Sequence, residues 1–306
     1  MAAVIKNRSE ILFLYDVTDA NPNGDPNDEN KPRIDEETGV NIVTDVRLKR
    51  TIRDYLYDYK KQEVFIREIT AENGTRKTKK DRLTEFNSNE ELLNRCIDLR
   101  LFGATTAVEE RRMTLTGPVQ FKYGRSLHRV DLTYIKGTTV MPSGEGKEQG
   151  TFTERYILPY SLIAFYGVIN ETAAAAQNIP LTDADIDLLM EAIWHGTKNL
   201  ISGSKFGQVP RLLIQICYQP GLSFYLGELD RRIAIRTEKT EEEIRRIEDL
   251  KLEVGPLLAS IAENRERIVQ VRLKIDAKLN TLKNGRPVNL MEELRQVPIA
   301  TRVFEF

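Results

Sequence analysis

The segment from Ile11 to Arg53 constrains the fold most, because three different kinds of structure must follow one another within it. Residues 10–17 alternate in pattern but carry large apolar side chains on both faces, which predicts a strand at the centre of a sheet. Residues 19–30 contain the dipeptides Asn-Pro, Asn-Gly and Asp-Pro, which favour turns. Thr44 and Asp45 then supply the cap and the first-turn acid of a helix. The segment therefore predicts a buried strand, a polar loop and a helix that packs back on the sheet.

The predicted helix, residues 45–60, has one apolar and one basic side. At about 100° per residue, its large apolar side chains gather on one face: Leu48, Ile52, Tyr55, Leu56 and Tyr59. The opposite arc carries four cations: Arg47, Lys49, Arg50 and Arg53. Asp54 is placed to neutralise Arg50, which leaves Lys49, Arg53 and Lys60 as an unpaired basic flank. This flank is a candidate phosphate contact, although plain solvation is the commoner reason for a charged helix face.

Strand-like and helix-like segments continue to alternate along the chain. The first three elements are a strand at 10–17, a helix at 45–60 and a strand at 64–69. A long polar excursion follows at 124–153. The last three elements are a strand at 157–168, a helix from Thr182 onward and a strand at 211–218. A strand at 111–123 is interrupted by Gly117-Pro118, because proline cannot donate to a central ladder. This order predicts an α+β protein with the ferredoxin-like (RRM-like) βαββαβ arrangement.

Two regions fall outside that core. In the polar excursion, residues 130–134 and 137–141 are predicted to pair as a hairpin arm. Residues 238–282 are highly charged with apolar residues at helical spacing, which predicts two helices broken near Gly255-Pro256. A last short strand is predicted within 297–306.

The composition argues against several classes of protein. The net charge of −1 excludes a globally basic nucleic-acid binder, so any such role must come from local clusters. The two cysteines, Cys96 and Cys217, suggest no disulfide framework, which fits a reducing cytoplasm. No apolar run reaches about 18 residues, so no membrane span is predicted. The histidines are His128 and His195, and no GxSxG, HExxH or GK[ST] motif occurs, so a metabolic enzyme is poorly supported.

Several polar clusters suit contact with nucleic acid. Small and hydroxyl residues beside a lysine favour phosphate binding at Ser202, Ser204, Lys205 and Gln208, but an ordinary helix-to-strand connection has the same composition. His128 lies in the polar excursion and is interpreted as a surface or RNA contact. The basic loop 76–82 is either a nucleic-acid contact or a solvated linker. Candidates for base stacking are Phe121, Tyr123 and Phe206, with core packing as the alternative. Candidates for a divalent cation are Asp25, Asp28 and Asp35, without the spacing of a calcium loop.

Taken together, these residues resemble a known family. The motifs that carry the resemblance are Asn21-Pro22-Asn23-Gly24-Asp25, Pro32-Arg33-Ile34-Asp35, Thr38-Gly39, TDVRLKRTIR at 44–53, DLRLFG at 98–103, GPVQF at 117–121, SLH at 126–128 and SKFGQVPR at 204–211. They are similar to the backbone subunit of the CRISPR-associated Cascade complex of type I systems, in the RAMP superfamily, and closest to the type I-B form. The resemblance spans roughly residues 11–218, and the charged C-terminal third adds little to it.

The resemblance implies an RRM-like palm over residues 1–230 with two insertions. A finger or web is expected at about 64–90 and a thumb at about 129–153. Residues 231–306 are expected to form a charged helical extension on the palm. By position, the residues carried over as contacts to the guide-RNA (crRNA) backbone are Lys49, Arg50, Arg53, Ser202, Ser204, Lys205 and Gln208.

The resemblance also implies a function. Several copies would stack head-to-tail along the crRNA, hold its phosphates without reading sequence, and present it for pairing with target DNA. The expected partners are crRNA, further copies of the chain and other Cascade subunits, with no cofactor and no catalysis. One alternative is a metal-dependent endoribonuclease that uses Asp35, as in related type III subunits. Another is a protein-only scaffold that binds no nucleic acid.

Overall fold

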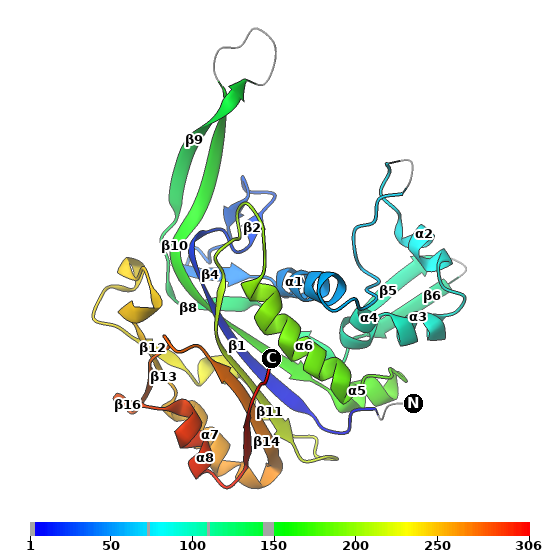
Figure 1. Cartoon of the computed structure of the whole chain (residues 1–306). Coiled ribbons are helices and arrows are strands. Elements are labelled where there is room, and N and C mark those ends of the chain that lie inside the picture. The colour runs from blue at the N-terminus through cyan, green and yellow to red at the C-terminus, as the bar shows by residue number, and fades with distance from the viewer. Residues whose placement is uncertain (1–3, 72–73, 109–110, 143–149) are drawn as a thin grey trace.

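One large sheet forms the centre of the molecule. The computed structural model describes residues 4–71, 74–108, 111–142 and 150–306. The sheet has the strand order β17-β14-β11-β1-β10-β8-β4 (Figure 1). These strands are β1 (Ser9–Ala20), β4 (Val40–Val43), β8 (Gly124–Arg129), β10 (Gly150–Ile169), β11 (Val209–Tyr218), β14 (Ile268–Ile275) and β17 (Ala300–Val303). Two more strands, β7 (Val119–Phe121) and β9 (Thr133–Pro142), also pair with β10.

Strand β1 occupies the central position that its apolar faces predicted. It pairs antiparallel with β10 along one edge and with β11 along the other. Ile11 and Phe13 enter the hydrophobic cluster that contains the apolar side chains of the two long helices. Leu12 and Leu14 enter a second cluster that is formed with the C-terminal part of the chain. All four side chains are fully buried, so β1 joins two hydrophobic cores.

Two long helices lie side by side on one face of the sheet (Figure 1). Helix α1 (Asp45–Asp58) begins after its predicted cap, Thr44. Helix α6 (Asp183–Lys198) begins with a capping box between Thr182 and Asp185. Gly196 lets the helices approach closely, because a Cβ at that position would lie 3.0 Å from the Cβ of Tyr55. The short helix α5 (Glu171–Ala176) precedes α6.

A small finger with its own hydrophobic cluster follows α1. Its elements are α2 (Lys79–Thr84), α3 (Asn89–Arg95), α4 (Ile97–Phe102), β5 (Gly103–Val108) and β6 (Arg111–Thr116). Phe65, Leu92 and Leu99 are buried within it. The strand predicted at 64–69 is wrong, because Phe65 N and Ile66 N donate to the Asp98 carboxylate instead of to a neighbouring strand.

The described part of the polar excursion contains a strand, β8, that the sequence pattern did not predict. Residues 124–129 form β8 and pair with both β10 and β4. The predicted hairpin between 130–134 and 137–141 is wrong, because β9 pairs instead with the first half of β10, with Tyr134 opposite Tyr156. These two strands form a long arm that projects from the sheet (Figure 1). The predicted thumb range also includes residues 143–149, which lie outside the described residues.

The C-terminal part is mixed rather than helical, so the predicted two helices over 238–282 are wrong. It contains η1 (Leu229–Arg231), β12 (Ala234–Arg236), η2 (Glu241–Glu243), η3 (Ile247–Asp249), β13 (Lys251–Glu253), α7 (Gly255–Glu263), η4 (Arg265–Arg267), β15 (Thr281–Lys283), β16 (Arg286–Val288) and α8 (Leu290–Gln296). Strand β14 extends the main sheet, and β17, the predicted last strand, pairs parallel to it. Apolar residues at helical spacing were misleading here because short strands buried on one face produce a similar density. The α+β class is confirmed, and no helix in the described part of the chain is long and apolar enough to cross a membrane.

A buried carboxylate fastens the C-terminal part to β1. Glu10 is 0% exposed and accepts hydrogen bonds from the Tyr166 hydroxyl at 2.5 Å and from the Tyr218 hydroxyl. The backbone N–H groups of Leu226 and Gly227 donate to the same carboxylate at 2.8 Å. Four donors thus satisfy one charge in a dry environment, which makes the carboxylate necessary for this packing.

We expect Glu10→Ala to lower the free energy of unfolding by about 3 kcal/mol or more, because it leaves several buried donors without an acceptor. Urea unfolding measures the change. Glu228→Ala is the control, since Glu228 is exposed and pairs with exposed Arg231, and a change within about 0.5 kcal/mol is expected there. Equal effects in the two variants would contradict the role assigned to Glu10.

Candidate nucleic-acid interface

The start of helix α1 is held by the turn-rich loop that precedes it. The Thr44 hydroxyl oxygen accepts a hydrogen bond from Arg47 N at 3.4 Å, as an N-cap does. The backbone N–H and the hydroxyl of Thr44 both donate to Asn23 Oδ1 at 2.8 Å. Asn23 lies just before the two-residue strand β2 (Gly24–Asp25), which pairs with β3 (Lys31–Pro32). The loop therefore sets where the first turn of α1 begins.

A second loop, residues 199–208, reaches the same place from the end of α6. Asn21 N donates to the carbonyl oxygen of Ser204 at 2.8 Å. Arg155, at the base of the arm, donates to the carbonyl oxygen of Gly203 at 3.1 Å. This loop is thus anchored between the turn-rich loop and the arm. It carries three of the predicted phosphate contacts at accessible positions. These residues are half-buried: Ser202, Ser204 and Lys205.

Arg47 and Lys205 lie on segments that the turn-rich loop connects, and neither forms an ion pair with a carboxylate in the described chain. Arg47 donates to the Thr51 hydroxyl at 2.8 Å, and its Nε is buried with no partner among the described residues. Lys205 Nζ donates to the Ser204 hydroxyl at 3.1 Å. Burial, and then the charge of Arg47, lower the pKa of Lys205. Burial likewise lowers the pKa of Arg47. Over the described ranges, neither cation pairs with a carboxylate, so the site has the electrostatics of an anion-binding position.

A cleft of about 530 Å³ continues from Arg47 between α1 and the finger. Its lining includes seven cations and one acid, Glu68: Arg47, Arg50, Arg53, Arg67, Lys77, Lys79 and Arg82. Most of these cations have a carboxylate partner outside the lining, such as Asp54 for Arg50 and Glu85 for Lys77. The cleft is therefore rich in donors but largely neutralised, and Arg47 and Lys79 are the lining cations without an ion pair among the described residues.

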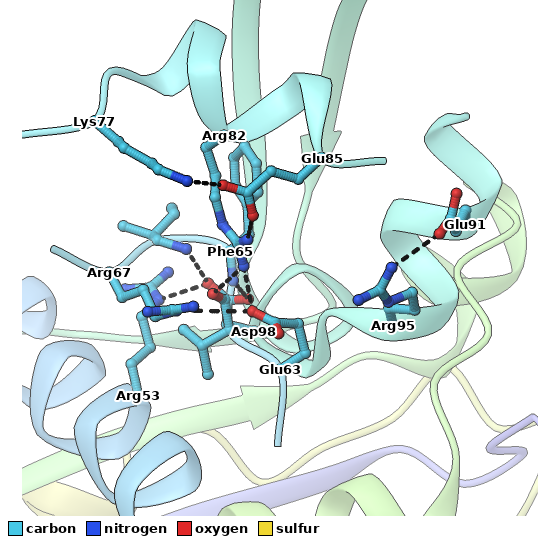
Figure 2. A network of polar contacts seen from close by, with 12 residues as sticks. Arg53, Glu63, Phe65, Arg67, Lys77, Arg82, Glu85, Glu91, Arg95 and Asp98 are labelled. Atoms are coloured by element: carbon cyan, nitrogen blue, oxygen red, sulfur yellow. Dashed lines mark hydrogen bonds and ion pairs between the residues drawn. The ribbon is translucent and has the colours of Figure 1, made fainter. Parts of the chain in front are cut away.

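The finger wall of the cleft is fixed by one buried ion pair. Arg53 Nε donates to Asp98 Oδ2 at 3.0 Å, and Asp98 is 0% exposed. Figure 2 shows Arg53 reaching from α1 to Asp98, beside Phe65 and Arg67. Asp98 also accepts from Phe65 N at 2.8 Å and Ile66 N at 3.1 Å. The pair thus joins the helix, the segment after it and α4 at a single point.

The prediction of an unpaired basic flank on α1 is wrong. Lys49 pairs with Asp45 at 2.8 Å, Arg53 with Asp98, and Lys60 with Glu191 at 2.5 Å. Two of these partners come from distant segments, so the helical projection had no means of showing them. The predicted pairing of Arg50 with Asp54 is confirmed at 2.7 Å. Phosphate contact by Lys49, Arg50 and Arg53 stays a prediction.

Two other predicted contacts lie in the interior. His128 is 2% exposed, because β8 is part of the sheet rather than of a polar surface excursion. Its Nε2 accepts from Leu162 N at 3.1 Å, and its Nδ1 lies 2.8 Å from the Arg129 carbonyl oxygen. The ring is therefore neutral with the proton on Nδ1, and burial lowers its pKa. Gln208 is 7% exposed, at the point where the 199–208 loop enters β11.

The aromatic candidates fall into different environments. Phe121 is 8% exposed and belongs to the core, as its alternative interpretation stated. Tyr123 is 55% exposed. Phe206 is 73% exposed and directly follows Lys205. It also borders a second cleft of about 410 Å³ with Asn21 and Tyr156. Of the three, Phe206 is the aromatic ring that lies beside the cation pair.

Comparison with known proteins gives the family. The model of the family described as CRISPR-associated protein Cas7 matches residues 7–255. A Haloferax volcanii protein with the same description is 32% identical over 304 residues, covering 89% of this chain and 88% of that protein. The chain belongs to the Cas7 family. The resemblance found in the sequence motifs is thereby confirmed at the level of the family.

Solved structures show that this Cas7-family chain has a known fold. One similar chain comes from a "CRISPR RNA-guided surveillance complex, pre-nicking", with a TM-score of 0.57 and 11% identity over 90% of this chain and 96% of that chain. Another, from a "CRISPR RNA-guided surveillance complex", has a TM-score of 0.51 and 14% identity over 90% and 94%. At these identities the likeness establishes the fold.

The acidic residues singled out as cation ligands are used in other ways in this family member. Asp25 pairs with Arg33 at 2.5 Å and Asp28 with Lys31 at 2.7 Å. Asp35 pairs with Arg125 at 3.2 Å and accepts from Glu37 N and Thr38 N in a turn. The Arg125 contact, followed by these backbone bonds, lowers the pKa of Asp35. Within the described ranges, no group of three or more metal-binding side chains occurs.

Sequence reasoning missed two residues of the site. Arg47 was placed on the basic arc of α1 but not among the contacts, and Asn23 was treated only as a turn former. A usable signal existed for Arg47, since it lies three residues after the cap and so beside the helix N-terminus. No local signal links Arg47 to Lys205, because their proximity depends on how α1 and α6 pack.

We expect Asp98→Ala to lower the free energy of unfolding by about 3–5 kcal/mol, because it leaves the buried Arg53 cation without a counter-charge. Chemical denaturation measures the loss. The matched control is Asp54→Ala, which removes the exposed partner of Arg50 and should cost less than about 1 kcal/mol. A loss of that small size in Asp98→Ala would contradict the structural role of the pair.

The burial of His128 predicts how the free energy of unfolding depends on pH. Its folded-state pKa is below the usual 6.5, so the unfolded chain takes up a proton more readily once the pH falls below about 6.5. The stabilisation is therefore complete above that pH and declines below it, by up to about 1.4 kcal/mol per pH unit. Unfolding at pH 7.5, 6.5 and 5.5 should show a shallower decline for His128→Gln than for the parent. Parallel curves would show that His128 does not contribute.

Proposed function

We propose that the chain is a non-catalytic crRNA-binding backbone subunit of a CRISPR surveillance complex of the Cascade kind. The observation that carries the proposal is that Arg47 and Lys205, two half-buried cations on segments connected by the turn-rich loop, have no carboxylate partner in the described chain. A phosphate group between them would supply the missing charge and accept from both. The flanking hydroxyls of Ser202 and Ser204 suit the same ligand, and none of these groups reads a base, which favours sequence-independent binding.

The core of the chain supports an RRM-like palm. The strands β11-β1-β10-β8 are adjacent in that order, with α1 following β1 and α6 connecting β10 to β11. In chain order this is strand, helix, strand, strand, helix, strand, which is the ferredoxin-like arrangement. We assign the finger to residues 63–116 and the thumb to the arm of β9 and β10, and the C-terminal part to a separate layer on the opposite face.

The arm and the cation pair suit an assembly of repeated copies. The base of the arm contacts the turn-rich loop, since Tyr156 donates to Glu29 at 2.8 Å and Lys31 lies 5.2 Å from the Tyr156 ring centre. An arm that projects from one side of the chain favours head-to-tail contact, which forms an open helical filament when the rotation does not close. In that arrangement, each copy would hold a stretch of crRNA backbone, and base pairing with target DNA would supply specificity. The complex would include other Cascade subunits.

The observations do not favour the endoribonuclease alternative. The Asp35 carboxylate is occupied by Arg125 and by two backbone N–H groups, which suits a structural turn. We therefore assign no catalytic role to Asp35.

Binding of single-stranded RNA of guide length, measured by filter retention across a salt series, tests the proposal. We expect Arg47→Ala and Lys205→Ala each to weaken binding about ten-fold, because each removes a charge-assisted hydrogen bond of about 1.5 kcal/mol. The slope of log K against log[salt] should fall by about 0.7 for each phosphate interaction that a substitution removes. Lys278→Ala is the control, since Lys278 is an exposed lysine paired with Glu248 in the C-terminal part.

Thermal unfolding without RNA distinguishes weaker RNA binding from an unfolded chain. Because neither Arg47 nor Lys205 forms an ion pair within the described chain, each substitution should leave the unfolding midpoint near that of the parent. RNA affinity equal to that of Lys278→Ala in both site variants would overturn the assignment of this site.

A further inference from the structure

The loop Asn21–Asp25 is bonded to both elements that carry the uncompensated cations. On one side, Asn23 Oδ1 accepts from the Thr44 backbone and hydroxyl, and the Thr44 oxygen in turn accepts from Arg47 N. On the other side, Asn21 N donates to the carbonyl oxygen of Ser204, the residue before Lys205. Two segments far apart in the sequence are thus tied to one short loop.

The loop is itself held by a hydrogen bond to Asn30 and by an ion pair with Arg33. Asn21 is 2% exposed, and its Nδ2 donates to the Asn30 carbonyl oxygen at 2.6 Å. Gly24 permits this closure, because a Cβ there would lie 2.1 Å from Asn30 Oδ1. Asp25 and Arg33 pair across the same turn at 2.5 Å. A loop closed in this way can hold its neighbours at set positions.

Such a support can hold two like charges in position before a ligand binds. Arg47 and Lys205 carry like charges on segments that the same loop connects, and after burial the charge of Arg47 also lowers the pKa of Lys205. A site that is already assembled before the anion arrives gains affinity, because less order must be imposed on binding. The support must therefore act on the backbone of α1 and of the 199–208 loop, which is where the Asn21–Asp25 bonds lie.

We propose that Asn23 is a positioning residue for anion binding by Arg47, acting through Thr44. The inference rests on the proposed function of the cation pair and adds a role for the turn-rich loop. The alternative is that Asn23, which lines the cleft, contacts RNA directly. Its Oδ1 already accepts two hydrogen bonds, and its Nδ2 lies 3.4 Å from the Gly24 carbonyl oxygen.

A double-mutant cycle in the full-length chain separates these roles. Filter binding of guide-length single-stranded RNA is measured for Asn23→Ala, Arg47→Ala and the double variant. Asn27→Ala is the matched control, since Asn27 lies two residues after this loop, within the turn-rich residues 19–30, and has an exposed side chain. We expect Asn23→Ala to weaken binding about five-fold in the parent and less than two-fold when Arg47 is already alanine.

Thr44 variants extend the test if Asn23→Ala unfolds the chain. Thr44→Ser keeps the hydroxyl that donates to Asn23 and accepts from Arg47 N, and it should bind RNA as the parent does. Thr44→Val removes the hydroxyl and should weaken binding by a factor similar to that of Asn23→Ala. Parent-like binding by Thr44→Val would overturn the proposal.

The outcomes distinguish this inference from the proposed function. An equal loss from Asn23→Ala in both backgrounds would show direct contact and overturn the positioning role. RNA affinity of Asn23→Ala equal to that of Asn27→Ala would also overturn the positioning role. In that case, reduced RNA affinity of Arg47→Ala would still support the proposed function. Parent-like binding by Arg47→Ala would overturn both.

Discussion

The burial of β1 on both faces and both edges is the constraint on which the rest of the structure depends. Its backbone pairs with β10 and β11, while its side chains alternate between two hydrophobic clusters. Helices α1 and α6 must therefore cover one face and the C-terminal part the other. The chain leaves the C-terminal end of β1 through the turn-rich loop and reaches α1 after β4, and the 199–208 loop enters β11 beside that same end of β1. Both segments that carry the unpaired cations are therefore brought to the same end of the sheet.

Charge in this protein is distributed with little net excess but with local imbalance. The chain has 45 basic and 46 acidic residues, and most of the cations around the cleft have a carboxylate partner. Paired cations of this kind fix the walls, as Arg53 and Asp98 do between α1 and the finger. The positive charge available to a ligand comes from the few cations that the fold leaves unpaired. This explains how a chain with a net charge of −1 can present a site suited to phosphate.

Sequence patterns predicted the elements whose signals are local. The apolar stretch of β1, the Thr44 cap, the apolar face of α1 and the break at Gly117-Pro118 are all present, because each depends on neighbouring residues. The predictions failed where partners distant in the sequence determine the local structure. Residues 64–69 form no strand because Asp98 accepts from the backbone N–H groups of Phe65 and Ile66. Residues 124–129 become a strand because β10 and β4 lie on either side, and this buries His128.

By itself, the sequence determined the family, the central strand, the amphipathic helix and the importance of the loop between them. Those features are encoded in motifs and periodicities that a linear chain displays. Tertiary structure alone decided which cations are free. Arg53 is neutralised by an aspartate 45 residues away, whereas Arg47 and Lys205 are connected through the turn-rich loop without an ion pair in the described chain. The physical reason is that electrostatic pairing depends on distance in space, and a helical projection contains no information about charges on other elements.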